Sequence, residues 1–297
     1  MVKIGVFDSG FGGLTVLKEI IAKVPQASTE YYADSGRNPY GVRPREEIQL
    51  FSRQILDFLA TKGIDVAVIA CNTATAASLP GIEPDYPFPI IGVVGAGAKG
   101  AVKATRNKRV GVVATEFTVK SGAYSEAIRK LDPEIYVVGQ PAMSFVKLVE
   151  SGVTTGDEAR AVVGDVLNAF RDSGIDTLVL GCTHFPLLAP LIAEVMGPDV
   201  TLVDPAEETA KETLSVLRSM FPGEDLGLAD GTVPDAKALA DQESVVAQKP
   251  VAGQKQVAAQ EPVRKYYTSG DPEVFARLGS VFLGSPIEKV EKVMLGE

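Results

Sequence analysis

Apolar runs and segments of helical period alternate along most of the chain. Apolar residues recur at helical spacing between the runs, as at Ile48, Phe51, Ile55 and Phe58. Strands that are apolar throughout and alternate with helices predict α/β architecture, with parallel sheets covered by helices on both faces. The runs predicted as strands cover residues 3–7, 30–33, 66–70, 90–94, 110–114, 135–138, 177–180 and 201–203.

The chain also repeats one local pattern. Gly5–Ser9 begins the first half and Gly111–Thr115 begins the second, and a cysteine follows each after a similar separation. Similar pieces at similar spacing predict two related lobes. At 297 residues, the chain is near the length at which one core becomes two. We expect a first lobe of residues 1–97 and 208–297, a second of residues 98–207, and a cleft between them.

The two cysteines of the chain lie in matching phrases. Cys71 follows the apolar run Val66–Ala70, Cys182 follows Leu178–Gly181, and a threonine comes within two positions of each. The same thiol in the same local pattern suggests a reaction that needs one group on each of two opposite faces of a substrate. The alternative is a structural role, because most free cysteines are small buried residues. The matched pair favours the reactive role.

Polar residues beside the cysteines suggest acid–base chemistry. A strand that ends at a cysteine and continues as a helix places the thiol near unpaired N–H groups, which predicts a lowered thiol pKa. Asp8 could set the protonation of one thiol and His184 that of the other, although a lone histidine is often structural. All these positions follow predicted strands, where parallel sheets bind ligands. Neutral groups that could hold carboxylates there are Ser9, Asn72, Thr73 and Thr183.

Charge and hydropathy limit the possible partners. A net charge of −9 and a pI near 4.9 argue against nucleic acid, since phosphate binding depends mainly on Lys and Arg. No apolar segment has the length of a membrane span, and the N-terminus lacks the features of a signal peptide. We therefore expect a cytoplasmic protein whose cysteines are reduced.

Two other classes of function stay open on the residues alone. Gly95–Gly100 fits the pattern G-x-G-x-x-G after a predicted strand, which would suit an NAD(P)-dependent oxidoreductase. However, it does not follow the first strand of a βαβ unit, and it leaves the matched thiols unexplained. A non-catalytic two-lobed module that binds small acids is the other alternative. Two separated cysteines and one histidine do not form a zinc site, so no metal is expected.

One stretch departs from the alternating pattern. Residues 222–265 contain no aromatic side chain, and Val246–Gln260 is a loose repetition of Val, Ala and Gln. Such a composition offers little to bury, which predicts a mobile insertion at about residues 224–263 rather than a third domain. Periodic structure resumes at Lys265, and an amphipathic helix is expected from about Glu273.

Four segments of the chain carry a resemblance to a known family. They are Phe7–Val16, Tyr32–Gly41, Ala70–Thr75 and Gly181–Leu187. Together they resemble the glutamate racemase family, and the likeness runs from residue 4 to about 217 and returns at residues 266–284. It implies a cofactor-independent racemase with two α/β lobes, which moves a proton between the faces of Cα with two thiols and supplies D-glutamate for bacterial peptidoglycan.

The resemblance also implies site residues and partners. Cys71 and Cys182 would be the acid/base thiols, assisted by Asp8, His184 and Glu150. Near Glu150 the chain departs from the family, with Lys147 in place of the usual proline. The implied substrate is glutamate and the implied assembly a homodimer; aspartate racemase is the nearest rival, since the same thiols would serve it. Residues that would contact glutamate are Asp8, Ser9, Tyr40, Gly41, Asn72, Thr73, Thr183 and His184.

Overall fold

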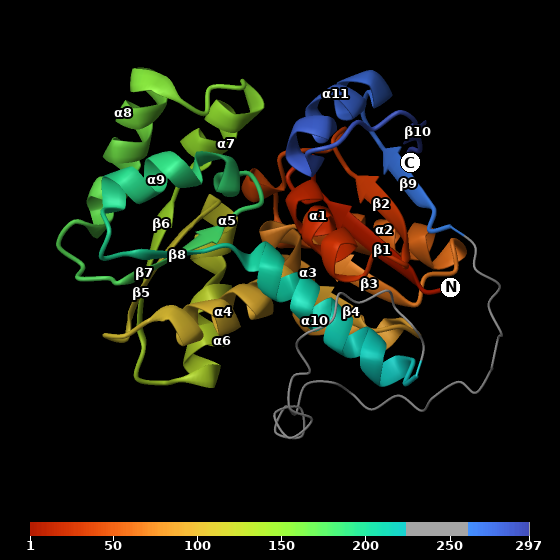
Figure 1. The fold of residues 1–297 in the computed structure, drawn as a ribbon, viewed down its shortest axis with the longest axis horizontal. Helices are drawn as coiled ribbons and strands as arrows, with labels where there is room; N and C mark the ends of the chain where they lie inside the picture. The colour runs from red at the N-terminus through yellow and green to blue at the C-terminus, as the bar shows by residue number, and fades with distance from the viewer. Residues whose placement is uncertain (224–260, 297) are drawn as a thin grey trace.

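The computed structural model describes residues 1–223 and 261–296, which form two parallel sheets (Figure 1). The larger sheet has the order β10-β9-β2-β1-β3-β4 and the smaller one β6-β5-β7-β8. The order 2-1-3-4 thus recurs as 6-5-7-8, which confirms the prediction of two related α/β lobes. The strands are β1 (Lys3–Asp8), β2 (Ser28–Ala33), β3 (Val66–Ile69), β4 (Ile90–Gly92), β5 (Arg109–Ala114), β6 (Tyr136–Pro141), β7 (Thr177–Gly181), β8 (Thr201–Val203), β9 (Arg264–Thr268) and β10 (Glu291–Lys292).

Helices cover both faces of each sheet (Figure 1). On the larger sheet, α1, α10 and α11 pack against one face, and α2 and α3 pack against the other. On the smaller sheet, α4 and α6 cover one face, and α7, α8 and α9 cover the other. The helices are α1 (Leu14–Lys23), α2 (Arg45–Thr61), α3 (Asn72–Ile82), α4 (Val93–Ala104), α5 (Glu116–Ser121), α6 (Ala123–Leu131), α7 (Met143–Glu150), α8 (Gly156–Leu167), α9 (Ala189–Met196), α10 (Pro205–Met220) and α11 (Pro272–Leu283). Short 3₁₀ turns are η1 (Tyr40–Val42), η2 (Glu83–Asp85), η3 (Asn168–Phe170) and η4 (Phe185–Leu188).

The hydrophobic pattern explains how these elements pack. In α2, Ile48, Phe51 and Ile55 are buried on one helical face, as their spacing predicts, and Phe58 packs at its edge. The strand β1 is buried over almost its whole length, as expected for a parallel strand that has helices on both faces. One continuous core cluster includes side chains of both lobes, so the lobes share packed apolar surface.

One prediction near the lobe junction needs correction. Val93 and Val94 were expected to end a strand but form the first turn of α4, because the strand stops at Gly92. The predicted lobe boundaries, 97/98 and 207/208, fall inside α4 and α10, which pack on each other. The exact boundaries therefore stay a prediction.

The predicted insertion at about residues 224–263 lies mostly outside the described residues. Its expected last residue, Val263, already pairs with the sheet: its carbonyl accepts the N–H of Thr29, and its N–H donates to Ser28 Oγ. The regular chain therefore resumes before Lys265. In the two described ranges, no helix is both long and apolar enough to cross a membrane.

Candidate active site

Both sheets direct polar residues toward the same junction. In a parallel sheet of order 2-1-3-4, ligands bind beyond the carboxyl ends of strands 1 and 3, where the direction of winding changes. The strand β1 ends at Asp8, and Cys71 lies just beyond β3; in the smaller sheet, Cys182 follows β7 at the equivalent place. The topology therefore brings the two cysteines to corresponding ends of the two sheets.

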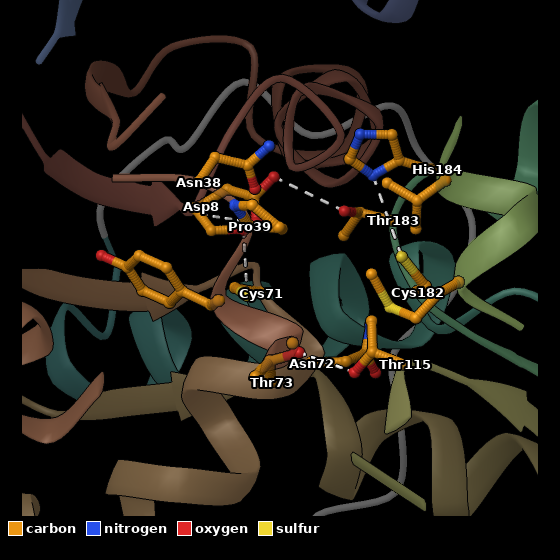
Figure 2. A pocket seen from close by; sticks show the side chains of 15 residues that line it. Asp8, Asn38, Pro39, Cys71, Asn72, Thr73, Thr115, Cys182, Thr183 and His184 are labelled. Atoms are coloured by element: carbon orange, nitrogen blue, oxygen red, sulfur yellow. Dashed lines mark hydrogen bonds between the residues drawn. The ribbon is translucent and has the colours of Figure 1, made fainter. Parts of the chain in front are cut away.

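A cavity at this junction is lined by both thiols (Figure 2). Cys71 and Cys182 approach it from opposite sides, each from its own lobe, and both are free and buried. The lining residues are Asp8, Ser9, Asn38, Pro39, Tyr40, Gly41, Cys71, Asn72, Thr73, Thr115, Met143, Val146, Cys182, Thr183 and His184. Apart from Glu150, every site residue predicted from the sequence belongs to this set.

The Cys71 thiol caps the N-terminus of α3. Its sulfur accepts the backbone N–H of Ala74 at 3.4 Å and lies 3.6 Å from Ser9 Oγ. Burial and the charge of Asp8 raise the pKa of Cys71, and the contacts with Ala74 and Ser9 offset this only in part. The predicted lowering of this pKa is therefore wrong for Cys71, because desolvation outweighs the helix N-terminus. With this raised pKa, Cys71 is a protonated thiol at neutral pH.

Asp8 is fixed by the chain that leads into α1. One carboxylate oxygen accepts the N–H of Ser9 at 2.8 Å and the other accepts the N–H of Gly13 at 2.7 Å. A Cβ on Gly13 would lie 2.6 Å from Asp8 Cβ, so a glycine is needed for this close approach. Thr183 Oγ1, from the other lobe, lies 3.5 Å from the carboxylate. Asp8 thus faces both halves of the cavity.

His184 lies between Cys182 and Glu150. Its Nδ1 is 3.8 Å from Cys182 Sγ (Figure 2), and its Nε2 is 3.5 Å from Glu150 Oε1. Burial lowers the pKa of His184, but the contacts with Cys182 and Glu150 outweigh it and raise the pKa to about 10. The imidazole is therefore a cation at neutral pH, 3.8 Å from the Cys182 sulfur.

Glu150 reaches the cavity only through His184 and Asn38, which line it. It lies outside the lining, and its Oε1 also accepts the side-chain amide of Asn38 at 3.0 Å. Contacts with His184 and Asn38 lower the pKa of Glu150, although burial opposes them. The carboxylate stays charged at neutral pH and bridges a residue of each lobe.

Neutral donors line the rest of the cavity. Asn72 and Thr73 begin α3, where the first-turn N–H groups have no acceptor within the helix and favour an anion. Tyr40 and Gly41 come from η1, and the Tyr40 hydroxyl points to the buried carboxylate of Asp34, with which it bonds. Tyr40 therefore lines the cavity without offering its hydroxyl to it.

Known proteins with similar sequence and structure identify the family. The chain matches the Asp/Glu/hydantoin racemase family over residues 4–213. The chain belongs to this family of racemases. It is 41% identical to a glutamate racemase of Oceanobacillus iheyensis over 276 residues, which cover 93% of this chain and 89% of the relative.

Solved structures agree with this assignment. A glutamate racemase from Bacillus anthracis superposes with a TM-score of 0.83 at 34% identity, over 99% of this chain and 98% of that chain. A glutamate racemase from Francisella tularensis in complex with D-glutamate superposes with a TM-score of 0.80 at 31% identity, over 99% of this chain and 97% of that chain. The chain is a racemase whose two parallel-sheet lobes match these structures.

Sequence reasoning overlooked the Thr115 hydroxyl, a polar group in the cavity of this racemase. Thr115 Oγ1 lies 2.9 Å from Thr73 Oγ1, so two hydroxyls bond across the lobes (Figure 2). The duplicated pattern could have found it, because Thr115 ends Gly111–Thr115 as Ser9 ends Gly5–Ser9. Asn38 also lines the cavity; it falls within the segment Tyr32–Gly41, but no contact was assigned to it. Met143 and Val146 line the cavity as well, and no sequence motif marks them.

The glycine pattern of the racemase does not form a dinucleotide loop. Gly95–Gly100 lies inside α4 rather than at a turn that enters a helix. Pyrophosphate binding needs the glycines in the turn that precedes the helix N-terminus. Here the pattern begins only at the third residue of α4, and the N–H groups of residues 97–100 already bond to carbonyls within the helix. The expectation that this pattern could hold NAD(P) is therefore wrong.

Proposed function

We propose that this racemase interconverts L- and D-glutamate without a cofactor, with Cys71 and Cys182 as its acid/base groups. The observation that carries the proposal is that two thiols line one cavity from opposite lobes. Racemisation removes a proton from one face of Cα and returns one to the other, which suits two groups of the same kind. The names of the similar proteins support glutamate as the substrate.

The protonation of the two sides suggests how turnover starts. Cys71 is a buried thiol beside the negative Asp8, whereas Cys182 faces the His184 cation. We assign the Cys182 thiolate as the base that takes the proton from L-glutamate, and the Cys71 thiol as the acid that protonates the opposite face. The reverse reaction begins with a Cys71 thiolate and D-glutamate.

Stabilising the carbanion is the larger task, because Cα–H is far less acidic than a thiol. Hydrogen-bond donors held around the α-carboxylate in a closed, dry cleft supply this stabilisation. The donors near the thiols are Asn72, Thr73 and Thr183, and we assign Asp8, which lines the same cavity, to the substrate ammonium. Glu150 contributes by keeping His184 charged.

Exchange in D₂O tests the proposal most directly. Purified protein without added cofactor is incubated with L-glutamate, and we expect deuterium at Cα together with loss of optical activity. Absence of exchange from either enantiomer would reject the glutamate reaction. Exchange with aspartate but not with glutamate would indicate an aspartate racemase, and binding of glutamate without exchange would indicate a binding module.

The physiological setting is part of the same proposal. We assign the enzyme to the cytoplasm, as a homodimer that supplies D-glutamate for peptidoglycan. Growth of a D-glutamate-requiring bacterium on expression of the chain tests the role in cell-wall synthesis, and loss of this rescue in Cys71→Ser ties it to catalysis. Sedimentation at several concentrations tests the dimer, and a single monomeric species would reject it.

A further inference from the structure

A further hydrogen bond joins the lobes at a residue that lines the cavity. Tyr124, in α6 of the second lobe, donates its hydroxyl hydrogen to Oδ1 of Asn72 at 2.7 Å. Asn72 is the first residue of α3 in the other lobe and lines the cavity directly after Cys71. Both side chains are buried, so neither has bulk water as an alternative partner.

This bond decides which end of the Asn72 amide is available. An asparagine side chain carries an acceptor oxygen and a donor NH₂, and only the donor suits a carboxylate. Because Tyr124 occupies Oδ1, both side-chain N–H groups of Asn72 remain available to a ligand. They have no hydrogen-bond partner within the described part of the chain. Burial raises the pKa of Tyr124, so its hydroxyl remains a donor at neutral pH.

The glycines around Tyr124 make room for its ring. A Cβ on Gly97 would lie 2.9 Å from the Tyr124 hydroxyl, and a Cβ on Gly181 would lie 3.2 Å from the ring edge. Gly181 directly precedes Cys182, so the ring packs against the strand that ends at the second thiol. Gly97 belongs to the pattern Gly95–Gly100, which the assigned reaction leaves unexplained.

We propose that Tyr124 is a positioning residue, which holds the Asn72 amide with its N–H groups toward a substrate carboxylate. Gly97 provides the slot in α4 through which the Tyr124 hydroxyl reaches Asn72. The proposal rests on the glutamate racemisation proposed above. The proposal explains Gly97 by its packing against Tyr124. It also means that the contact of Asn72, in the first lobe, with a substrate carboxylate depends on a residue of the second lobe.

Kinetics of Tyr124→Phe test the proposal. The variant keeps the ring but loses the bond, so Asn72 can rotate. KM for glutamate should rise about 3- to 10-fold, and kcat should fall as well, because Asn72 is one of the donors assigned to stabilise the carbanion. The control is Tyr86→Phe, which should leave KM unchanged. It removes a hydroxyl that donates to Asp57 over 2.9 Å, and Tyr86 does not line the cavity. An unchanged KM in Tyr124→Phe would overturn the proposal.

A double-mutant cycle separates positioning from general support of the fold. If Tyr124 acts only through Asn72, adding Tyr124→Phe to Asn72→Ala should raise KM no further. An equal rise in both backgrounds would show that Tyr124 has a structural role instead. This comparison uses the enzyme's own glutamate turnover, so failure of the wild type to exchange glutamate rejects the proposed function, whereas failure of the cycle rejects only the role of Tyr124.

Gly97→Ala gives a second, independent variant. Its Cβ displaces the Tyr124 hydroxyl, so KM should rise as in Tyr124→Phe, and the two changes should not add. Gly95→Ala is the matched control, because a Cβ there meets no atom within 4 Å. Equal KM values in Gly97→Ala and Gly95→Ala would contradict the proposed slot, and circular dichroism confirms that each variant is folded.

Discussion

The His184 imidazole and the Glu150 carboxylate form an ion pair, with 3.5 Å between Nε2 and Oε1. Cys182 lies at the other ring nitrogen, so the imidazole has an electron-rich neighbour on each side. This arrangement favours the protonated ring despite its burial. At neutral pH His184 already carries its second proton, so it acts as a fixed cation beside the thiol rather than as a base.

The ionisation of His184 is directly measurable, because the chain has one histidine. We expect an NMR titration of its ring protons to give a pKa of about 10 in the wild type. Glu150→Gln should lower this pKa, since it removes one of the groups that raise it. Glu116→Gln, which changes a carboxylate paired with Lys120 on the surface, should not. A titration near the ordinary value of about 6.5 in the wild type would contradict the ion pair.

The same pair predicts how stability depends on pH. Below about pH 6.5 the folded and unfolded chains both bind the proton of His184, so its contribution is complete. Between this value and about 10 the folded chain binds more protons, and the contribution to the free energy of unfolding is lost as pH rises. Urea unfolding should therefore show the largest wild-type advantage over Glu150→Gln near pH 6, shrinking toward pH 10. A difference that is constant over this range would reject the coupling.

Each thiol should be essential. Cys71→Ser and Cys182→Ser should each reduce racemisation by about 10²- to 10⁴-fold, because each face of Cα needs its own proton donor and acceptor. Polarimetry with both enantiomers measures the loss, and unchanged thermal unfolding confirms the fold. Near-normal racemisation by either variant would rule out the two-base scheme.

Substitutions on the two sides of the cavity should affect the two directions of racemisation differently. His184→Asn should lower kcat from L-glutamate more than kcat from D-glutamate, because the cation faces Cys182. Asp8→Asn should lower both, since the proposed function also assigns Asp8 to the substrate ammonium. The equilibrium constant stays at unity, so the asymmetry appears in the separate kcat and KM values and not in their Haldane ratio. Equal effects of His184→Asn in both directions would return His184 to a structural role.

Gly12 should be intolerant of any side chain. A Cβ at this position would overlap Thr183 Oγ1 and lie 2.8 Å from His184 Nδ1, so Gly12→Ala must displace the residues that follow Cys182. Such a displacement should lower kcat/KM by about 10²-fold with the fold retained. In Gly10→Ala the nearest atom, in Asn38, is 3.7 Å away, and activity should be preserved. Equal activities of the two variants would refute the steric argument.

Much of the fold could be predicted from the sequence, because buried parallel strands are apolar along their whole length. The central strands β1, β3, β5 and β7 fell within one or two residues of their predicted bounds. In contrast, β10 is two exposed residues, Glu291 and Lys292, whose pairing depends on β9 and leaves no local pattern. Val93 and Val94 were misassigned because their β-branched side chains fit a strand, whereas their packing belongs to α4.

The candidate site was predictable to a similar extent. Its thiols and their neighbours follow strands, so the edge at which they gather could be inferred. The protonation of Cys71 could not, since desolvation depends on how completely the folded chain surrounds the sulfur. The hydrogen-bond partners Tyr124 of Asn72 and Asn38 of Glu150 come from the opposite lobe, and sequence spacing carries no information on such contacts.

The pairing of β9 with β2 links the cavity to the order in which the chain is made. Ser269, just after β9, donates to Asp34, and the same carboxylate accepts the hydroxyl of Tyr40 beside the cavity. All residues that line the cavity precede this support in the chain. We therefore expect a nascent chain to carry both thiols on the ribosome yet stay inactive until its last strands emerge and pair.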